Sequence, residues 1–211
     1  ADHPEAEIVA FVHSETPSGT LNPAREIGRI AREHGALVIA DVVSSLGGEE
    51  LRVDDWGLDV CVAGPQKCLA GPSGMSLMAV SDAAWERMRA NPSAPRGSFL
   101  SLLDWKDRWI DGGRVAFPYT PSVSDIHGVD AACDEVLEIG IDESVAIHRR
   151  AAAAVRAGVV AMGVELWARR EEIATSCVTA ARTPEGIDTM ELLAHVRERY
   201  GVMLSPAYGE L

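Results

Sequence analysis

The chain has 211 residues, of which 47% are hydrophobic, and it carries a formal net charge of −13 at pH 7. Nucleic-acid binding needs a concentrated basic face, and the densest basic features of the sequence are the short pairs Arg149-Arg150 and Arg169-Arg170. The composition therefore excludes nucleic acid as a partner. The sequence holds no apolar stretch of about 18 or more residues, so we expect no membrane-spanning helix.

The first predicted elements form a strand–helix–strand unit. Residues 7–12 are an apolar run typical of a buried strand, and a polar turn over 13–19 follows. Asn22 should cap the next helix, with Pro23 at its first position. Residues 36–40 then form a second strand. A helix between two strands at this spacing predicts that the strands are parallel and that helices cover both faces of the sheet.

Two more strands are predicted at 60–63 and 76–80. The link between them is no longer than about a dozen residues, which is short for a parallel crossover, so this pair should be antiparallel. Asp82 should cap a helix that reaches Asn91, and the following proline should end it.

Residues 92–123 are rich in proline and glycine, and we expect an irregular connection with a functional or interfacial role. Two helices should follow it, at 124–139 and 143–162, separated by Gly140. The remaining expected elements are a strand at 177–181, a helix at 188–199 capped by Asp188, and a strand at 202–204.

These elements predict three parts. They are the latter part of a large α/β domain over 1–123, connecting helices over 124–162, and the start of a small C-terminal domain over 163–211. Both domains are expected to be incomplete, because the chain begins and ends abruptly and its first residues resemble neither a signal peptide nor an initiator sequence.

Cysteine and histidine usage indicates the compartment and argues against a metal. The widely spaced Cys61, Cys68, Cys133 and Cys177 form no Cys-x-x-Cys pair, which is typical of reduced thiols in a cytoplasmic protein. We expect Cys68 to be a small packed side chain. The six histidines show no metal-ligand spacing, so no metal site is expected.

Lys67 and Asp41 each follow a predicted buried strand. Lys67 lies between the Gly64-Pro65 and Gly71-Pro72 turns, where small residues let an amine project into a cleft. An amine and an acid at two strand ends suit a carbonyl cofactor, with the lysine as a Schiff base and the acid paired with a pyridine nitrogen. The alternatives are a surface lysine and a carboxylate that caps its own turn, and Asp41 could serve in both ways.

Five further side chains are candidates for holding such a cofactor. Val43, two residues beyond the acid, could cover one face of a ring or belong to the core. Thr16 and Ser18 lie in a turn where a hydroxyl could reach the ring's phenolic oxygen or bond the turn backbone. Gln66 could donate to a phosphate or be a polar turn residue. Thr120 lies in the proline-rich connection, where interface packing is the competing role.

Three segments in this order resemble class V aminotransferases of the fold-type I pyridoxal-phosphate superfamily: HSETPSGTLNP at 13–23, ADVVSSLGG at 40–48 and GPQKCLAGP at 64–72. The segments FPYTPSV at 117–123 and ARTPEGID at 181–188 extend the likeness over nearly the whole chain. The nearest resemblance is to the pyridoxamine–pyruvate and alanine–glyoxylate types. It implies an α/β fold with a mostly parallel sheet, helices on both faces and a small C-terminal α/β domain.

The resemblance also implies roles for single residues. The residue matching Lys67 forms a Schiff base with pyridoxal 5′-phosphate, and the one matching Asp41 pairs with its pyridine nitrogen. Val43 matches a residue packed on the ring, Thr16 a hydroxyl near the phenolic oxygen and Gln66 a phosphate contact.

Thr120 matches a residue that reaches the phosphate in the neighbouring subunit, which implies a homodimer with shared sites. Two family features are missing: the Ser/Gly-rich phosphate loop would precede this chain, and the arginine that binds the substrate carboxylate would follow Leu211. Phe117 stands where phosphate-binding relatives often carry tyrosine. It fits the pyridoxamine–pyruvate type, in which unphosphorylated pyridoxal is a substrate rather than a bound coenzyme.

The implied activity moves an amino group from an amino acid such as alanine, or from pyridoxamine itself, to a small 2-oxo acid such as pyruvate or glyoxylate. One alternative keeps the fold and makes the protein a lyase, epimerase or cysteine desulfurase. Desulfurases usually carry histidine where this chain has Gln66, and they need a cysteine on a mobile loop, which we do not expect here. The other alternative is a non-catalytic effector or scaffold, against which the intact Lys67 and Asp41 pair argues.

Overall fold

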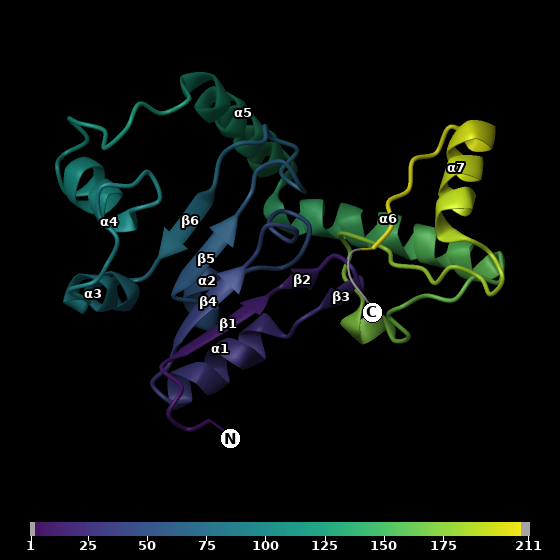
Figure 1. Ribbon diagram of the computed structural model, residues 1–211, viewed down its shortest axis with the longest axis horizontal. Coiled ribbons are helices and arrows are strands. Elements are labelled where there is room, and N and C mark those ends of the chain that lie inside the picture. Colours follow the sequence, from purple (N-terminus) through teal and green to yellow (C-terminus); the bar gives the residue numbers. More distant parts are fainter. Residues whose placement is uncertain (1–2, 208–211) are drawn as a thin grey trace.

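A four-stranded sheet forms the centre of the computed structural model, which describes residues 3–207 (Figure 1). The sheet order is β1-β4-β5-β6. The first three pair in parallel and β6 pairs antiparallel to β5, which confirms both expectations about strand direction. The strands are β1 (Ile8–Val12), β4 (Leu37–Asp41), β5 (Val60–Ala63) and β6 (Leu77–Val80). A separate short hairpin of β2 (Ser14–Glu15) and β3 (Thr20–Leu21) occupies the predicted polar turn.

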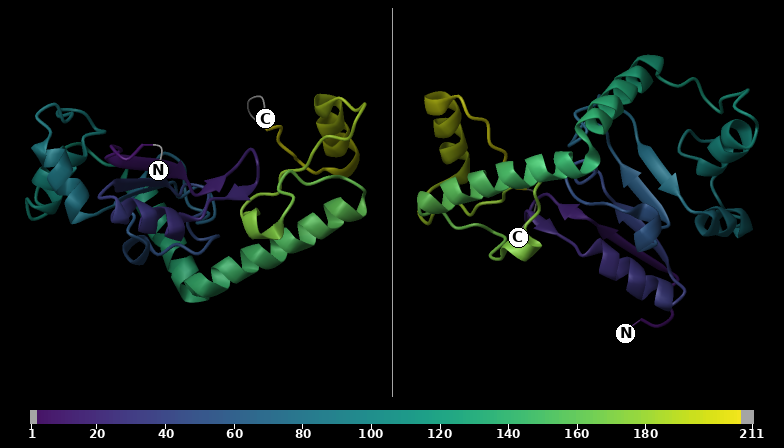
Figure 2. Two further views of the ribbon diagram at one scale, coloured as in Figure 1. Left: turned by 90° about the horizontal axis from the view of Figure 1, so that it is seen from below. Right: turned by 180° about the vertical axis from the view of Figure 1, so that it is seen from behind.

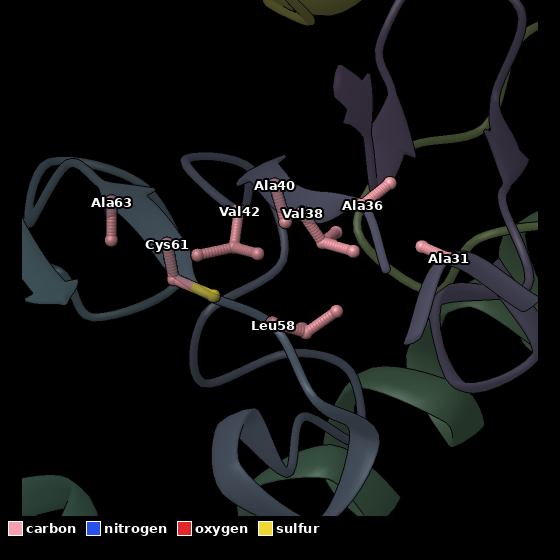
Figure 3. Packing of buried hydrophobic residues seen from close by; sticks show 8 residues of the cluster. All are labelled: Ala31, Ala36, Val38, Ala40, Val42, Leu58, Cys61 and Ala63. Carbon is pink, nitrogen blue, oxygen red and sulfur yellow. The ribbon is translucent and has the colours of Figure 1, made fainter. Parts of the chain in front are cut away.

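The core lies on one face of the sheet, where α1 (Ala24–Glu33) and α2 (Val53–Trp56) cover it. Figure 3 shows its centre, where small and branched side chains interdigitate. Alternation along β4 points Val38 and Ala40 into this layer, and both are fully buried. A Cβ at Gly28 would collide with the Trp56 carbonyl oxygen, so this glycine allows the two helices to pack closely.

The opposite face of the sheet carries apolar side chains that stay accessible. Ile8 is 50% exposed and Met78 40% exposed, whereas Leu37 and Ile39 are half-buried. Within residues 3–207 the helices packed on the sheet cover the face on which α1 lies (Figure 2). Helices were expected on both faces, and this part of the chain supplies them for that one face. Asp41 shares the accessible face with Leu37 and Ile39, because it follows them at intervals of two.

Helix starts differ from prediction at two places. Asn22 does not cap α1; its side-chain amide donates to the carbonyl oxygen of Val12 at 2.7 Å, which ties the helix entry to the end of β1. The helix α3 (Asp82–Ala90) is capped by Ser81, whose hydroxyl accepts from the Ala84 N–H, so Asp82 is its first residue and not its cap. Ser81 thus makes the capping hydrogen bond of α3, whereas α1 begins after Pro23 with no side-chain cap.

The connection over 92–123 is less irregular than expected. It contains α4 (Leu102–Trp105) followed by a π-helical turn, η1 (Lys106–Ile110). Arg89 of α3 bonds Asp107 at 3.1 Å and Asp111 at 2.8 Å, and Phe117 stacks on Trp109 with ring centroids 4.0 Å apart. These long-range contacts hold a segment that its proline and glycine content alone describes as a loop.

Two long helices lead to the C-terminal part (Figure 1). They are α5 (Val123–Ile139) and α6 (Ile141–Ala161), and Gly140 with a φ of 90° separates them as predicted. The hydroxyl of Ser144 donates to the Gly47 carbonyl oxygen at 2.7 Å, which fixes the start of α6 against the turn after β4. None of the helices within 3–207 is long and apolar enough to cross a membrane.

The C-terminal part has helices but not the predicted strands. A 3₁₀ turn, η2 (Glu171–Ile173), precedes α7 (Thr189–Tyr200), whose Asp188 side chain caps it as expected. Residues 177–181 and 202–204 form no strand; single bridges join Thr20 to Ala174 and Leu166 to Ala181. The end of the first segment is held by backbone hydrogen bonds to residues 165–167, where the Trp167 N–H donates to the Ala180 carbonyl oxygen at 2.9 Å, and the second segment is exposed.

Candidate active site

Five separate chain segments line an open cavity of about 400 Å³. Its walls come from the hairpin turn between β2 and β3, the turns that follow β4 and β5, helix α6 and the segment after η2. The lining residues are Thr16, Ser44, Lys67, Cys68, His148, Cys177 and Val178. The cavity therefore lies beyond the carboxyl ends of two parallel strands, where open α/β sheets bind their ligands.

Lys67 reaches this cavity from a compact loop after β5. The Gly71 N–H donates to the Pro65 carbonyl oxygen at 2.8 Å, and the Ala70 N–H donates to the Lys67 carbonyl oxygen at 2.9 Å. Because its backbone is held while its side chain stays exposed, the amine of Lys67 is free to react with a ligand in the cavity.

Asp41 ends β4, the strand adjacent to β5, so its carboxylate and the Lys67 loop lie at the same edge of the sheet. The Oδ1 oxygen accepts the Val43 N–H at 2.9 Å, which is the turn-capping role weighed as an alternative. This leaves Oδ2 to accept a hydrogen bond from a ligand. Asp41 does not itself line the cavity.

Two hydroxyls close one side of the cavity. Thr16 Oγ1 lies 3.1 Å from Ser44 Oγ, so the hairpin turn and the turn after β4 meet there. Ser18 instead shares a hydrogen bond of 2.7 Å with the Thr20 hydroxyl inside the hairpin, a local bond to a side chain where one to the turn backbone was the expected alternative.

The other candidates lie outside the lining. Val43 is half-buried beside Ser44, and the exposed Gln66 folds back over Gly64. Thr120 is exposed in the connection after η1, and the cavity lining does not include it.

Five lining residues were not predicted as site residues: Ser44, Cys68, His148, Cys177 and Val178. Ser44 adjoins Val43, so its place in the turn after β4 is a signal that could have found it. His148 and Cys177 belong to segments far along the chain, and no spacing in the sequence connects them to Lys67. Cys68 lines the cavity and is half-buried, so it is not simply a packed side chain.

His13, which directly follows β1, contacts the turn after β4 that carries Ser44. Its ring is buried, and Nδ1 lies 3.0 Å from the hydroxyl oxygen of Ser45. Burial lowers the pKa of His13 from its usual 6.5, and the carboxylate of Glu49 partly opposes this shift. The imidazole is therefore neutral at pH 7, and it joins the end of β1 to the turn after β4.

Comparison with known proteins gives the family. Residues 3–209 match the family described as Aminotransferase class-V. A pyridoxamine–pyruvate transaminase of Mesorhizobium japonicum is 47% identical over 208 residues, which are 99% of this chain and 52% of that protein. An L-aspartate–glyoxylate aminotransferase of Paracoccus denitrificans is 34% identical, over 98% of this chain and 52% of its own length.

A solved structure of pyridoxamine–pyruvate aminotransferase from Mesorhizobium loti superimposes with a TM-score of 0.93 at 46% identity, covering 99% of this chain and 53% of that one. The chain belongs to the class V aminotransferases, a pyridoxal-phosphate-dependent family, and it has the fold-type I architecture. It spans about half the length of the curated relatives it matches.

The described residues fit pyridoxal phosphate. The cavity offers an exposed amine and a pair of hydroxyls, and an unshared carboxylate oxygen lies at the same sheet edge. These are the donor, acceptor and nucleophile types that a pyridine aldehyde requires.

Proposed function

We propose that the protein is an aminotransferase that moves an amino group from a primary amine to a small 2-oxo acid, pyruvate or glyoxylate. The observation that carries this proposal is the opening of Lys67 into a cavity at the edge of the sheet where Asp41 ends the neighbouring strand. The family match supports it.

The proposed roles divide between the two strand ends. The pyridine ring, of bound pyridoxal phosphate or of pyridoxamine where the vitamin itself is the amine substrate, would supply an electron sink when a proton is lost from the carbon beside the amine. Lys67 Nζ would hold the aldehyde carbon and afterwards carry the proton from one carbon to the other. Asp41 Oδ2 would keep the ring nitrogen protonated, and Thr16 would donate towards the phenolic oxygen.

Val43 and Gln66 would contact the ring and the phosphate. Both lie within two residues of a main site residue, so small side-chain movements would bring them to a ligand. A ring bound beside Val43 should slow backbone amide exchange in the turn after β4, which hydrogen–deuterium exchange can measure; unchanged exchange there would count against a ring in contact with this turn.

Two amine donors remain candidates: an amino acid such as alanine, and pyridoxamine itself. The relative at 47% identity is a pyridoxamine–pyruvate transaminase, and Phe117 lacks the hydroxyl that a phosphate could use. Phe117 packs on Trp109, which suits an apolar support more than a phosphate contact. We therefore favour pyridoxamine and pyruvate as the substrate pair.

The proposal extends to assembly, compartment and domains. Thr120 would reach the phosphate in a second copy of the chain, giving a homodimer.

The free thiols Cys61, Cys68, Cys133 and Cys177 suit the reducing cytoplasm, and localisation of a tagged protein would test this. The parts 1–123, 124–162 and 163–211 are proposed as domain limits, and limited proteolysis should cut near them.

The test uses the intact protein and three reactions. Pyridoxamine with pyruvate should give pyridoxal and alanine. If the protein instead reacts only with L-alanine and glyoxylate in the presence of pyridoxal phosphate, it is still an aminotransferase, but its amino donor is an amino acid and not pyridoxamine. Release of sulfide from L-cysteine, without amino transfer, would favour a desulfurase, a reading that gains weight because Cys68 and Cys177 line the cavity. Activity in none of the three would contradict the proposal.

A further inference from the structure

Two cysteine sulfurs meet in the cavity wall beside Lys67. A Cβ placed on Gly48 would lie 2.7 Å from Cys68 Sγ and 2.8 Å from Cys177 Sγ, so both sulfurs flank the small volume that the glycine leaves open. Both residues also line the cavity, Cys68 from the loop after β5 and Cys177 from the segment after η2. Their separation along the sequence is large, so this contact depends on the fold.

A buried hydrogen-bond network fixes Cys177 in this place. The Thr175 hydroxyl donates to Glu49 Oε1 at 3.0 Å, and Glu49 also accepts the Ser176 N–H. The Ser14 hydroxyl lies 2.9 Å from Thr175 Oγ1, which in turn accepts the Cys177 N–H at 3.2 Å. Because Thr175 and Glu49 are almost fully buried, Cys177 is held against the turn after β4.

Cys68 is the more reactive of the pair. His148 Nδ1 donates to the Ser144 carbonyl oxygen at 2.9 Å, which orients the imidazole in the same cavity lining as Cys68. The neighbouring Cys177 thiol is the main cause that lowers the pKa of Cys68 to about 7. The pKa of Cys177 is raised, mainly by Cys68 and then by burial. Cys68 is therefore the thiol that ionises first, and it lies beside a second thiol that can react with its oxidised form.

We propose that Cys68 and Cys177 are an oxidation site, which a peroxide converts into an intramolecular disulfide next to Lys67. The Cys68 thiolate attacks one peroxide oxygen and the O–O bond breaks. The other oxygen takes up a proton and departs as water, and Cys68 becomes a sulfenic acid. The sulfur of Cys177 then attacks the sulfenic sulfur, its proton passes to the departing hydroxyl, and a second water leaves. Two thiols are oxidised by two electrons and one peroxide is reduced to two waters.

The disulfide changes the loop that carries the reactive amine. The S–S bond draws the two sulfurs together to about 2 Å, which shifts the backbone at Cys68 and therefore the adjacent Lys67. This consequence rests on the proposed function, whereas formation of the disulfide does not. The oxidised protein should bind pyridoxal phosphate less tightly and recover when a dithiol reduces it.

The test treats the intact, reduced protein with hydrogen peroxide and then maps thiols by mass spectrometry without reduction. Two of the four thiols should disappear, as one peptide pair joining Cys68 to Cys177, and dithiothreitol should restore them. Cys61 is an internal control, because its thiol is buried and burial raises its pKa to about 11. Survival of both Cys68 and Cys177 as thiols, or a different pairing, would overturn the proposal.

Two variants keep the test informative. Cys177→Ser should stop at the Cys68 sulfenic acid, which dimedone traps, whereas Cys133→Ser should form the same disulfide as the parent protein. Trapping in Cys177→Ser at no more than the parent level would count against the proposal. A disulfide that forms while cofactor binding is unchanged would confirm the oxidation site and reject only its effect on Lys67.

Discussion

Asp41 has two carboxylate oxygens with different surroundings, and this difference predicts how a substitution should behave. Asn in its place can still accept the Val43 N–H, so the turn should survive. It cannot hold a pyridine nitrogen protonated, so Asp41→Asn should lower kcat roughly 10²-fold or more while the protein still binds the cofactor.

Steady-state kinetics with saturating cofactor measure this effect. Asp59→Asn is the matched control, because Asp59 bonds the Val38 N–H at 2.8 Å and the Ser81 hydroxyl at 2.7 Å at the other end of β5. It should reduce stability and leave kcat close to that of the parent. An Asp41→Asn enzyme with the parent kcat would remove Asp41 from the mechanism.

His13 predicts an acid-sensitive fold. Its folded-state pKa is lowered by burial, so below about pH 6.5 the unfolded chain binds a proton that the folded chain excludes. The contribution of neutral His13 to the free energy of unfolding is therefore complete above pH 6.5. It is lost as the pH falls, by up to about 1.4 kcal/mol per pH unit. Denaturant unfolding between pH 7.5 and about pH 5 should show this slope in the parent and a weaker one in His13→Asn. The control is His34→Asn, which changes an exposed histidine. Equal slopes in the parent and in His13→Asn would refute the assignment of the acid sensitivity to His13.

Single residues at strand ends were predictable from the sequence, and residues brought together from afar were not. Lys67 and Asp41 stand directly after apolar runs, and the carboxyl ends of adjacent parallel strands share one edge of a sheet. The cavity also uses His148 and Cys177, whose positions depend on how α6 and the segment after η2 return to the sheet. No local pattern in the sequence carries that information.

At the scale of elements, the segment after η2 is held to the sheet through Thr175. Its hydroxyl bonds Glu49, Ser14 and the Cys177 N–H, and it is fully buried. Thr175→Val keeps the shape and leaves these polar groups without a partner, so it should lower the free energy of unfolding by about 1–3 kcal/mol.

Thermal or urea unfolding would measure the loss. Thr183→Val is the control, because Thr183 bonds Thr189 at 2.8 Å in an exposed position and should change stability much less. If the two variants were equally stable, the buried network would contribute little to holding the C-terminal part.

The elements that the sequence predicted correctly are those whose own pattern determines them. Apolar runs gave the four strands of the sheet, and glycine at 140 and 201 marked helix ends. The strands expected at 177–181 and 202–204 were wrong, because the pairing of the first segment with residues 165–167 amounts to a single bridge and the second segment stays exposed. Likewise α4 and η1 depend on contacts with α3 that proline and glycine content does not reveal.

For the whole molecule, the connection over 92–123 indicates an interface. Phe99 is 68% exposed and Val115 87% exposed, and Thr120 lies in the same segment. Large apolar side chains at the surface of one segment favour contact with another chain. The protein should therefore elute as a dimer in light-scattering chromatography, and Phe99→Glu should shift it towards monomer with loss of activity. A monomeric, fully active parent protein would contradict shared sites.

The central claim is that Lys67 holds the cofactor aldehyde, and the chain allows a direct test because its two lysines are Lys67 and Lys106. Lys106 is engaged elsewhere, in an ion pair with Asp111 and over the Trp85 ring at 5.8 Å. Pyridoxal phosphate would be added to the intact protein, reduced in place with borohydride, and the labelled peptide identified by mass spectrometry. The account predicts label at Lys67, its loss in Lys67→Ala and its retention in Lys106→Ala. Label at Lys106, or undiminished label in Lys67→Ala, would contradict it.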